Sequence, residues 1–160
     1  MYSELESIVL VENFFGDFVE DGNLDEVEDF VSVDYIGHDF SDSGEIEGTK
    51  GVKDTIQAVR NSFDGFEVAL GDTHVSDNRV VSMIGIRGDQ NESVLGIDPS
   101  PDGQTEIFGV AISLIEDGKI REQWLDLTPN LVSFRFCDIH DPCHIYPSLY
   151  NSCPYMSPTD

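Results

Sequence analysis

Basic residues are scarce in this chain. Only 8 of its 160 residues are Lys or Arg, against 32 Asp and Glu, and the formal net charge is -24 at pH 7. A surface of this sign repels the phosphates of nucleic acids and the anionic headgroups of membranes. We therefore exclude nucleic acid and membrane surfaces as partners.

Long apolar runs are also missing. No stretch approaches the roughly 20 apolar residues that cross a bilayer, and residues 1–15 lack the basic start of a secretion signal. We therefore expect a cytoplasmic protein. The apolar content of 39% in 160 residues is enough for one folded domain.

Cysteine occurs only near the end of the chain, at Cys137, Cys143 and Cys153, so disulfides cannot staple the main body. Cys137, His140, Cys143 and His144 are zinc ligands by type, but the adjacent pair Cys143 and His144 fits one tetrahedral ion poorly. We predict no metal and no cofactor.

The composition changes in the last thirty or so residues. Residues 132–160 contain no Glu or Lys and show no sustained hydrophobic period. We expect a domain over residues 1–131, followed by a poorly ordered tail over 132–160.

Hydrophobic spacing predicts helices first and strands later. Residues 3–22 open with Ser3 and Glu6 in the spacing of a capping box, and shorter helical patterns follow over 23–31 and 49–63. Strand patterns follow over 66–70, 79–88, 106–115 and 119–127, and Asp117-Gly118 predicts a hairpin between the last two. This order predicts an α+β fold, with residues 34–48 as a loop.

The last strand suggests a functional site. Regular alternation puts Ile120, Glu122, Trp124, Asp126 and Thr128 on one face. A bent sheet partly covered by helices encloses a cavity that can hold a small molecule. A carboxylate beside an indole in such a cavity would lose hydration, so its pKa would rise and it could act as a general acid or base.

Four strings in this order resemble the SnoaL-like polyketide cyclase family of the NTF2-like fold: residues 13–39, 47–53, 78–88 and 110–124. The resemblance covers about residues 5–131. It implies a cone of three N-terminal helices packed on a strongly bent antiparallel sheet, usually dimeric through the sheet. It also implies cofactor-independent ring closure by intramolecular aldol condensation.

The resemblance also implies site residues. Tyr35 and His38 match the family's Tyr-x-x-His and are expected at the pocket mouth, while Trp124 matches the family tryptophan. The family's acid/base Asp lies four residues after that tryptophan, where this chain has Thr128. Asp126, on the same predicted face, becomes the candidate acid/base.

We therefore expect a catalytic pair, Asp126 and His38, with Trp124, Tyr35, Thr128 and Phe108 contacting the substrate. The first hypothesis is cyclase-type acid/base chemistry on a small apolar carbonyl compound. The second is a non-catalytic module that binds a small molecule or dimerises, since one fold hosts many functions. The third is epoxide or ester hydrolysis by a water-activating carboxylate in the same pocket.

The acidic surface generates a first prediction. Carboxylates at this density repel one another in dilute buffer, whereas in molar salt the Debye length is only about 3 Å and the repulsion is screened. We expect a halophilic protein whose melting temperature is higher in molar KCl than in dilute buffer. Thermal unfolding followed by circular dichroism in both solutions tests this, and an unchanged or lower value in KCl contradicts it.

Overall fold

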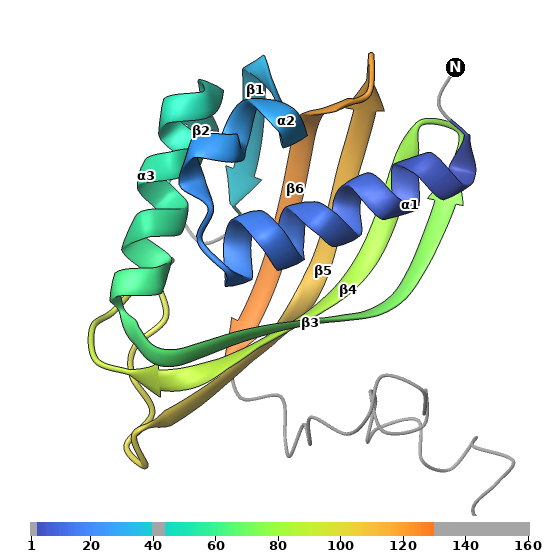
Figure 1. Ribbon diagram of the computed structural model, residues 1–160. Helices are drawn as coiled ribbons and strands as arrows, with labels where there is room; N and C mark the ends of the chain where they lie inside the picture. Colours follow the sequence, from blue (N-terminus) through green and yellow to red (C-terminus); the bar gives the residue numbers. More distant parts are fainter. Residues whose placement is uncertain (1–2, 40–43, 130–160) are drawn as a thin grey trace, which may run out of the picture.

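The protein is an α+β domain in which a layer of helices covers one face of a strongly bent sheet (Figure 1). The computed structural model describes residues 3–39 and 44–129. The expected tail, with its cysteines and histidines, lies outside these residues, and the domain boundary at residue 131 stays a prediction. The helical elements are α1 (Glu4–Asn13), η1 (Phe14–Glu20), η2 (Leu24–Glu26), α2 (Val27–Phe30) and α3 (Gly48–Asn61).

The sheet has six strands in the order β2-β1-β6-β5-β4-β3. The strands are β1 (Val31–Asp39), β2 (Glu45–Glu47), β3 (Phe63–Ser76), β4 (Arg79–Gln90), β5 (Gln104–Glu116) and β6 (Lys119–Pro129). Neighbouring strands from β3 to β6 are antiparallel, whereas β1 is parallel to β6. The sheet is therefore mixed rather than wholly antiparallel.

The first helix begins and continues as its residues dictate. The predicted capping box is confirmed, because the Ser3 amide donates to the Glu6 carboxylate at 2.8 Å and the Glu6 amide donates to the Ser3 hydroxyl at 3.2 Å. After Asn13 the helix widens into the π-helical turns of η1. Four apolar side chains of η1 are buried there: Phe14, Phe15, Phe18 and Val19.

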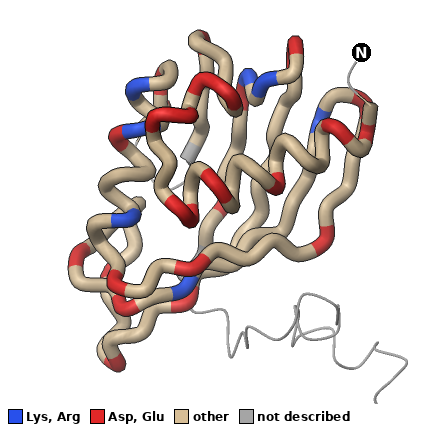
Figure 2. The backbone as a smooth tube through the Cα atoms, viewed as in Figure 1, with Lys and Arg blue, Asp and Glu red and all other residues tan. Residues whose placement is uncertain are grey.

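Arg60 closes the end of η1 from the neighbouring helix. Its Nη1 donates to the carbonyl oxygens of Val19, at 3.0 Å, and of Glu20. These are carbonyls that a helix end leaves without partners, and the guanidinium charge suits that end of the helix dipole. Asp and Glu lie along α1, η1 and α2 and in several turns (Figure 2), whereas α3 carries Lys50, Lys53 and Arg60.

The hairpin between β5 and β6 is confirmed. Asp117 has a φ of 49° and Gly118 a φ of 72°, the left-handed pair that a tight two-residue turn requires.

Gly109 lies within β5 and allows β6 to approach closely. A Cβ there would overlap the carbonyl oxygen of Asp126, so only glycine lets β6 approach so closely.

The expectation that three helices precede every strand is wrong. Residues 34–48 were expected to form a loop, yet β1 and β2 occupy most of this segment and precede α3. Its Gly and Asp residues are typical of turns, but β1 pairs with β6, a strand more than eighty residues later. Pairing between distant segments overrides local propensity here, and it cannot be read from the segment itself.

No helix in the described part of the chain is long and apolar enough to cross a membrane.

Candidate functional site

A cavity lies between the helical layer and the inner face of the sheet. Side chains from η1, α3 and strands β1, β2, β3, β4 and β6 form its walls. All of the lining residues are Phe, Val, Ile or Leu except Tyr35, Thr55 and Gln123. The space open to the centre of a water-sized sphere is about 60 Å³. One water needs about 10–15 Å³ on this scale, so the space corresponds to roughly four to six waters.

A chain of hydrogen bonds crosses the inner face of the sheet beside this cavity. The Tyr35 hydroxyl donates to Oε1 of Gln123 at 3.0 Å, and Nε2 of Gln123 donates to the Ser113 hydroxyl at 2.9 Å. These residues lie on β1, β6 and β5, and their exposed fractions are 3%, 1% and 0%. Two of these neutral groups, Tyr35 and Gln123, line the cavity and give it a polar end, and Ser113 holds the Gln123 amide.

Burial raises the pKa of the Tyr35 phenol above its ordinary value. The hydroxyl therefore keeps its proton at neutral pH and remains a hydrogen-bond donor. Among the lining residues it is the only titratable group, because none of the others is Asp, Glu, His, Lys, Arg or Cys. The part of the cavity wall that the structure describes thus lacks a group that could remove a proton from a substrate at neutral pH.

The expectation that Asp126 enters the cavity is wrong, and a β-bulge is the reason. Ile120 and Glu122 pair with consecutive residues of β5, so Arg121 has no partner in that ladder. One extra residue reverses the alternation of side chains beyond it. Ile120 and Gln123 both point inward, with exposed fractions of 0% and 1%, although they are three residues apart.

Beyond the bulge the two faces of β6 separate clearly. Gln123, Leu125 and Leu127 line the cavity, whereas the side chains that alternate with them, including Asp126, point to the outer face. Asp126 is exposed. The loss of hydration that would make its carboxylate an acid/base group is therefore missing, and Trp124 forms no wall of the cavity.

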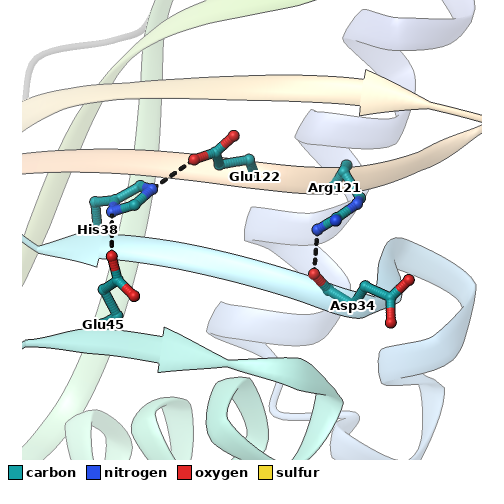
Figure 3. A network of polar contacts seen from close by, with 5 residues as sticks. All are labelled: Asp34, His38, Glu45, Arg121 and Glu122. Carbon is teal, nitrogen blue, oxygen red and sulfur yellow. Dashed lines mark hydrogen bonds and ion pairs between the residues drawn. The ribbon is translucent and has the colours of Figure 1, made fainter.

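His38 also lies on the outer face, where it joins a cluster with Trp124, Glu122 and Glu45. Figure 3 shows His38 between the two carboxylates of this cluster. The imidazole stacks on the indole with ring centroids 5.3 Å apart and an interplanar angle of 19°. Its Nε2 lies 2.6 Å from the Glu122 carboxylate, and its Nδ1 lies 3.7 Å from that of Glu45. The cluster ties β2, β1 and β6 together outside the cavity, so His38 is not at the pocket mouth.

The side chain of Arg121 also connects β6 to β1. Its Nη1 donates to the backbone oxygen of Asp34 on β1 (Figure 3). The ladder between β1 and β6 shifts register between Val31 and Ile36, so this contact joins the two strands where their regular pairing is interrupted.

The remaining predicted contacts divide as follows. Tyr35 lines the cavity. Phe108 is buried but is not among the lining residues, because it alternates with Ile107 and Gly109 on β5 and belongs to the other face. Thr128 pairs with Phe108 in the ladder, and its side chain lies outside the described residues.

Sequence reasoning missed Gln123 and Ser113. Ser113 carried a signal, since it is a lone hydroxyl within the apolar strand pattern of residues 106–115. Gln123 carried none, because the face it occupies depends on the bulge at Arg121. The two residues are direct partners in the β5–β6 ladder.

No group of three or more His, Cys, Asp or Glu residues suited to a metal ion exists within residues 3–39 and 44–129. The segment with Cys137 and His140 lies beyond these limits.

Comparison with known proteins agrees with this fold. Residues 9–127 match the model of the SnoaL-like polyketide cyclase family. No curated protein matches the chain significantly.

Several solved structures are similar. TsrD from Streptomyces laurentii has a TM-score of 0.68 and 20% identity, covering 79% of this chain and 91% of its own. A protein from Jannaschia sp. CCS1, assigned to the SnoaL-like polyketide cyclases, has a TM-score of 0.65 and 19% identity, covering 79% and 90%. An LEH-like epoxide hydrolase from M. tuberculosis has a TM-score of 0.58 and 15% identity, covering 76% and 84%. At these identities the likeness establishes the NTF2-like fold alone.

The buried phenol makes a prediction about alkaline stability. Above about pH 10 the unfolded chain loses the Tyr35 proton while the folded chain keeps it, so folding stability falls as pH rises. We expect the free energy of unfolding to fall less steeply in Tyr35→Phe than in the wild type over this range. At pH 7 the variant should lose about 1 kcal/mol with its hydrogen bond. Urea unfolding at pH 7 and along a series above pH 9 measures both effects, and equal slopes would contradict burial of the phenol.

Proposed function

Because this chain belongs to the SnoaL-like polyketide cyclase family, we propose that its cavity binds a small, neutral, largely apolar compound without acid/base turnover. One observation carries this proposal. Within the described residues, the cavity wall combines apolar side chains with the polar groups of Tyr35, Thr55 and Gln123, and it contains no carboxylate and no imidazole.

The absence of charge in the wall favours a neutral ligand. A buried ion without a partner is strongly disfavoured, and among residues 3–39 and 44–129 no Lys, Arg, Asp or Glu lines the cavity to pair with one. The net charge of -24 opposes anions further. Neutral compounds enter without these costs, and their apolar surface gains from contact with the Phe, Val, Ile and Leu side chains.

Cyclisation and hydrolysis receive less support. Intramolecular aldol condensation needs a base to remove a proton next to a carbonyl, and hydrolysis needs a carboxylate that activates water. The wall offers a protonated phenol, an amide and the hydroxyl of Thr55, which already donates to the Gly51 oxygen at 2.8 Å. None of these is a base at neutral pH. The second sequence hypothesis, a binding module, is therefore our proposal.

A homodimer through the outer sheet face belongs to the same proposal. Five half-buried apolar side chains alternate there with inward-facing residues on β4 and β5: Val81, Met83, Val110, Ile112 and Leu114. The described helices cover the opposite face (Figure 1). A second copy of the chain would remove these side chains from water.

Charge placed on this face should prevent association. Ile112 lies in the middle of the five, so we expect Ile112→Lys to sediment as a monomer and the wild type as a dimer. Leu5→Lys is the matched control, because Leu5 is 71% exposed on α1, in the helical layer. Analytical ultracentrifugation measures both variants. A monomeric wild type rules out the homodimer, and a dimeric Ile112→Lys rules out this face.

Filling the cavity should abolish ligand binding. Val68 lines the cavity from β3 and is half-buried, so Val68→Phe occupies the space with a change in stability of about 1–3 kcal/mol. Cyclopentanone, a small neutral ketone, is the probe, and binding is followed by shifts in the ¹H–¹⁵N spectrum. We expect the wild type to bind and Val68→Phe not to bind.

Two controls accompany this variant. Val33→Phe adds the same bulk at a site that is 70% exposed and outside the cavity wall, and Asp126→Asn removes the acid of the first hypothesis. Both should bind the ketone as the wild type does. A wild type that does not bind it contradicts the proposed function.

A further inference from the structure

The Gln123 side chain is held at both ends. Its Oε1 accepts from Tyr35 at 3.0 Å and its Nε2 donates to Ser113 at 2.9 Å, while the residue is only 1% exposed. An amide fixed by two hydrogen bonds in a buried site has one orientation, and its remaining N–H and lone pair point in set directions.

The backbone on the other side of Gln123 makes this arrangement possible. Gly37 is its neighbour in the β1–β6 ladder, and a Cβ on Gly37 would lie 2.8 Å from the Tyr35 hydroxyl oxygen. The missing side chain lets the phenol lie along the sheet and reach the amide. Gly37 therefore allows the Tyr35 hydroxyl to reach and hold the Gln123 amide.

A count of the hydrogen-bond donors of Tyr35, Gln123 and Ser113 shows which donor lacks an acceptor. Tyr35 and Ser113 each have one O–H and the amide has two N–H groups, which makes four donors. The two bonds of the chain use two donors, and whichever way the amide is turned, one N–H of Gln123 is left over. No acceptor within the described residues takes it. Buried donors in native proteins are rarely without an acceptor.

The surroundings of this N–H limit what can accept it. Gln123 itself lines the cavity, and the neighbouring wall residues on its strand, Leu125 and Leu127, are apolar. A carboxylate ligand would accept a hydrogen bond well, but it would bring an unpaired charge into this wall. An uncharged carbonyl oxygen supplies the acceptor without the charge.

We propose that Gln123 is the ligand-recognising residue of the cavity, and that its free N–H donates to the carbonyl oxygen of a small neutral ketone, ester or lactone. Tyr35 and Ser113 are positioning residues that hold the amide in place. This inference rests on the proposed function and adds to it the polar group by which the ligand is selected.

Two probes of nearly the same shape test this with the wild-type protein. Cyclopentanone has the acceptor oxygen, and methylenecyclopentane replaces it by a CH₂ group. One hydrogen bond corresponds to a roughly three- to tenfold tighter binding of the ketone. We also expect the ketone, but not the alkene, to shift the side-chain NH₂ signals of Gln123 in the ¹H–¹⁵N spectrum.

The outcomes separate this inference from the proposed function. Binding of neither probe contradicts the proposed function itself. Equal binding of both probes leaves the proposed function standing and overturns the role of Gln123. So does a ketone preference that leaves the Gln123 side-chain signals unmoved.

Variants provide a second test. Gln123→Met keeps an unbranched side chain of similar length but has no N–H, so it should bind both probes equally. Tyr35→Phe keeps the Gln123 N–H but frees one end of the amide, so the ketone preference should shrink without vanishing. Asp126→Asn, on the outer face, should keep the full preference. A ketone preference that survives in Gln123→Met overturns the proposal.

Discussion

The bulge at Arg121 determines which side chains of β6 face the cavity. Without the bulge, the side chains that alternate with Gln123, Leu125 and Leu127 would face inward, so the cavity would receive the indole of Trp124 and the carboxylate of Asp126. With one residue skipped, an amide and two leucines face inward, and the charged side chains face water. A shift of one residue in a strand exchanges its two faces completely, so the identity of the site depends on this irregularity more than on composition.

Charged and neutral side chains are also unevenly distributed over the rest of the domain. Among the residues whose exposure the structure describes, no Asp or Glu is buried, and the residues that line the cavity are neutral. Hydrogen bonds are electrostatically stronger where the effective dielectric constant is low, so the chain from Tyr35 to Ser113 is better ordered than the same groups would be in water. The His38 cluster, half-exposed on the other face, serves the sheet edge instead.

Much of the fold could be predicted from sequence. The capping box at Ser3, the Asp117-Gly118 turn and the strand patterns are local signals, and the structure contains all of them. The resemblance to the family supplied the cone. The parallel partner of β1 could not be predicted, because it lies far along the chain. The inward face of β6 could not be predicted either, because a bulge leaves no mark in the alternation of residue types. Trp124 and Asp126, which that alternation placed in the cavity, therefore lie outside it, whereas Tyr35, taken from the resemblance to the family, lines it.

The parallel pairing of β1 with β6 also affects the order in which the domain can fold. Within the described residues, β1 has only the three-residue β2 and β6 as neighbours in the sheet. Strand β6 begins about eighty residues after β1 ends, with α3 and β3 to β5 between them. A loop of this length must close before Tyr35 can meet Gln123, and such distant contacts form slowly. The helices and the strands from β3 to β5 precede β6 in the chain, so they are synthesised before it. The hydrogen bond between Tyr35 and Gln123 therefore cannot form before β6 has been synthesised.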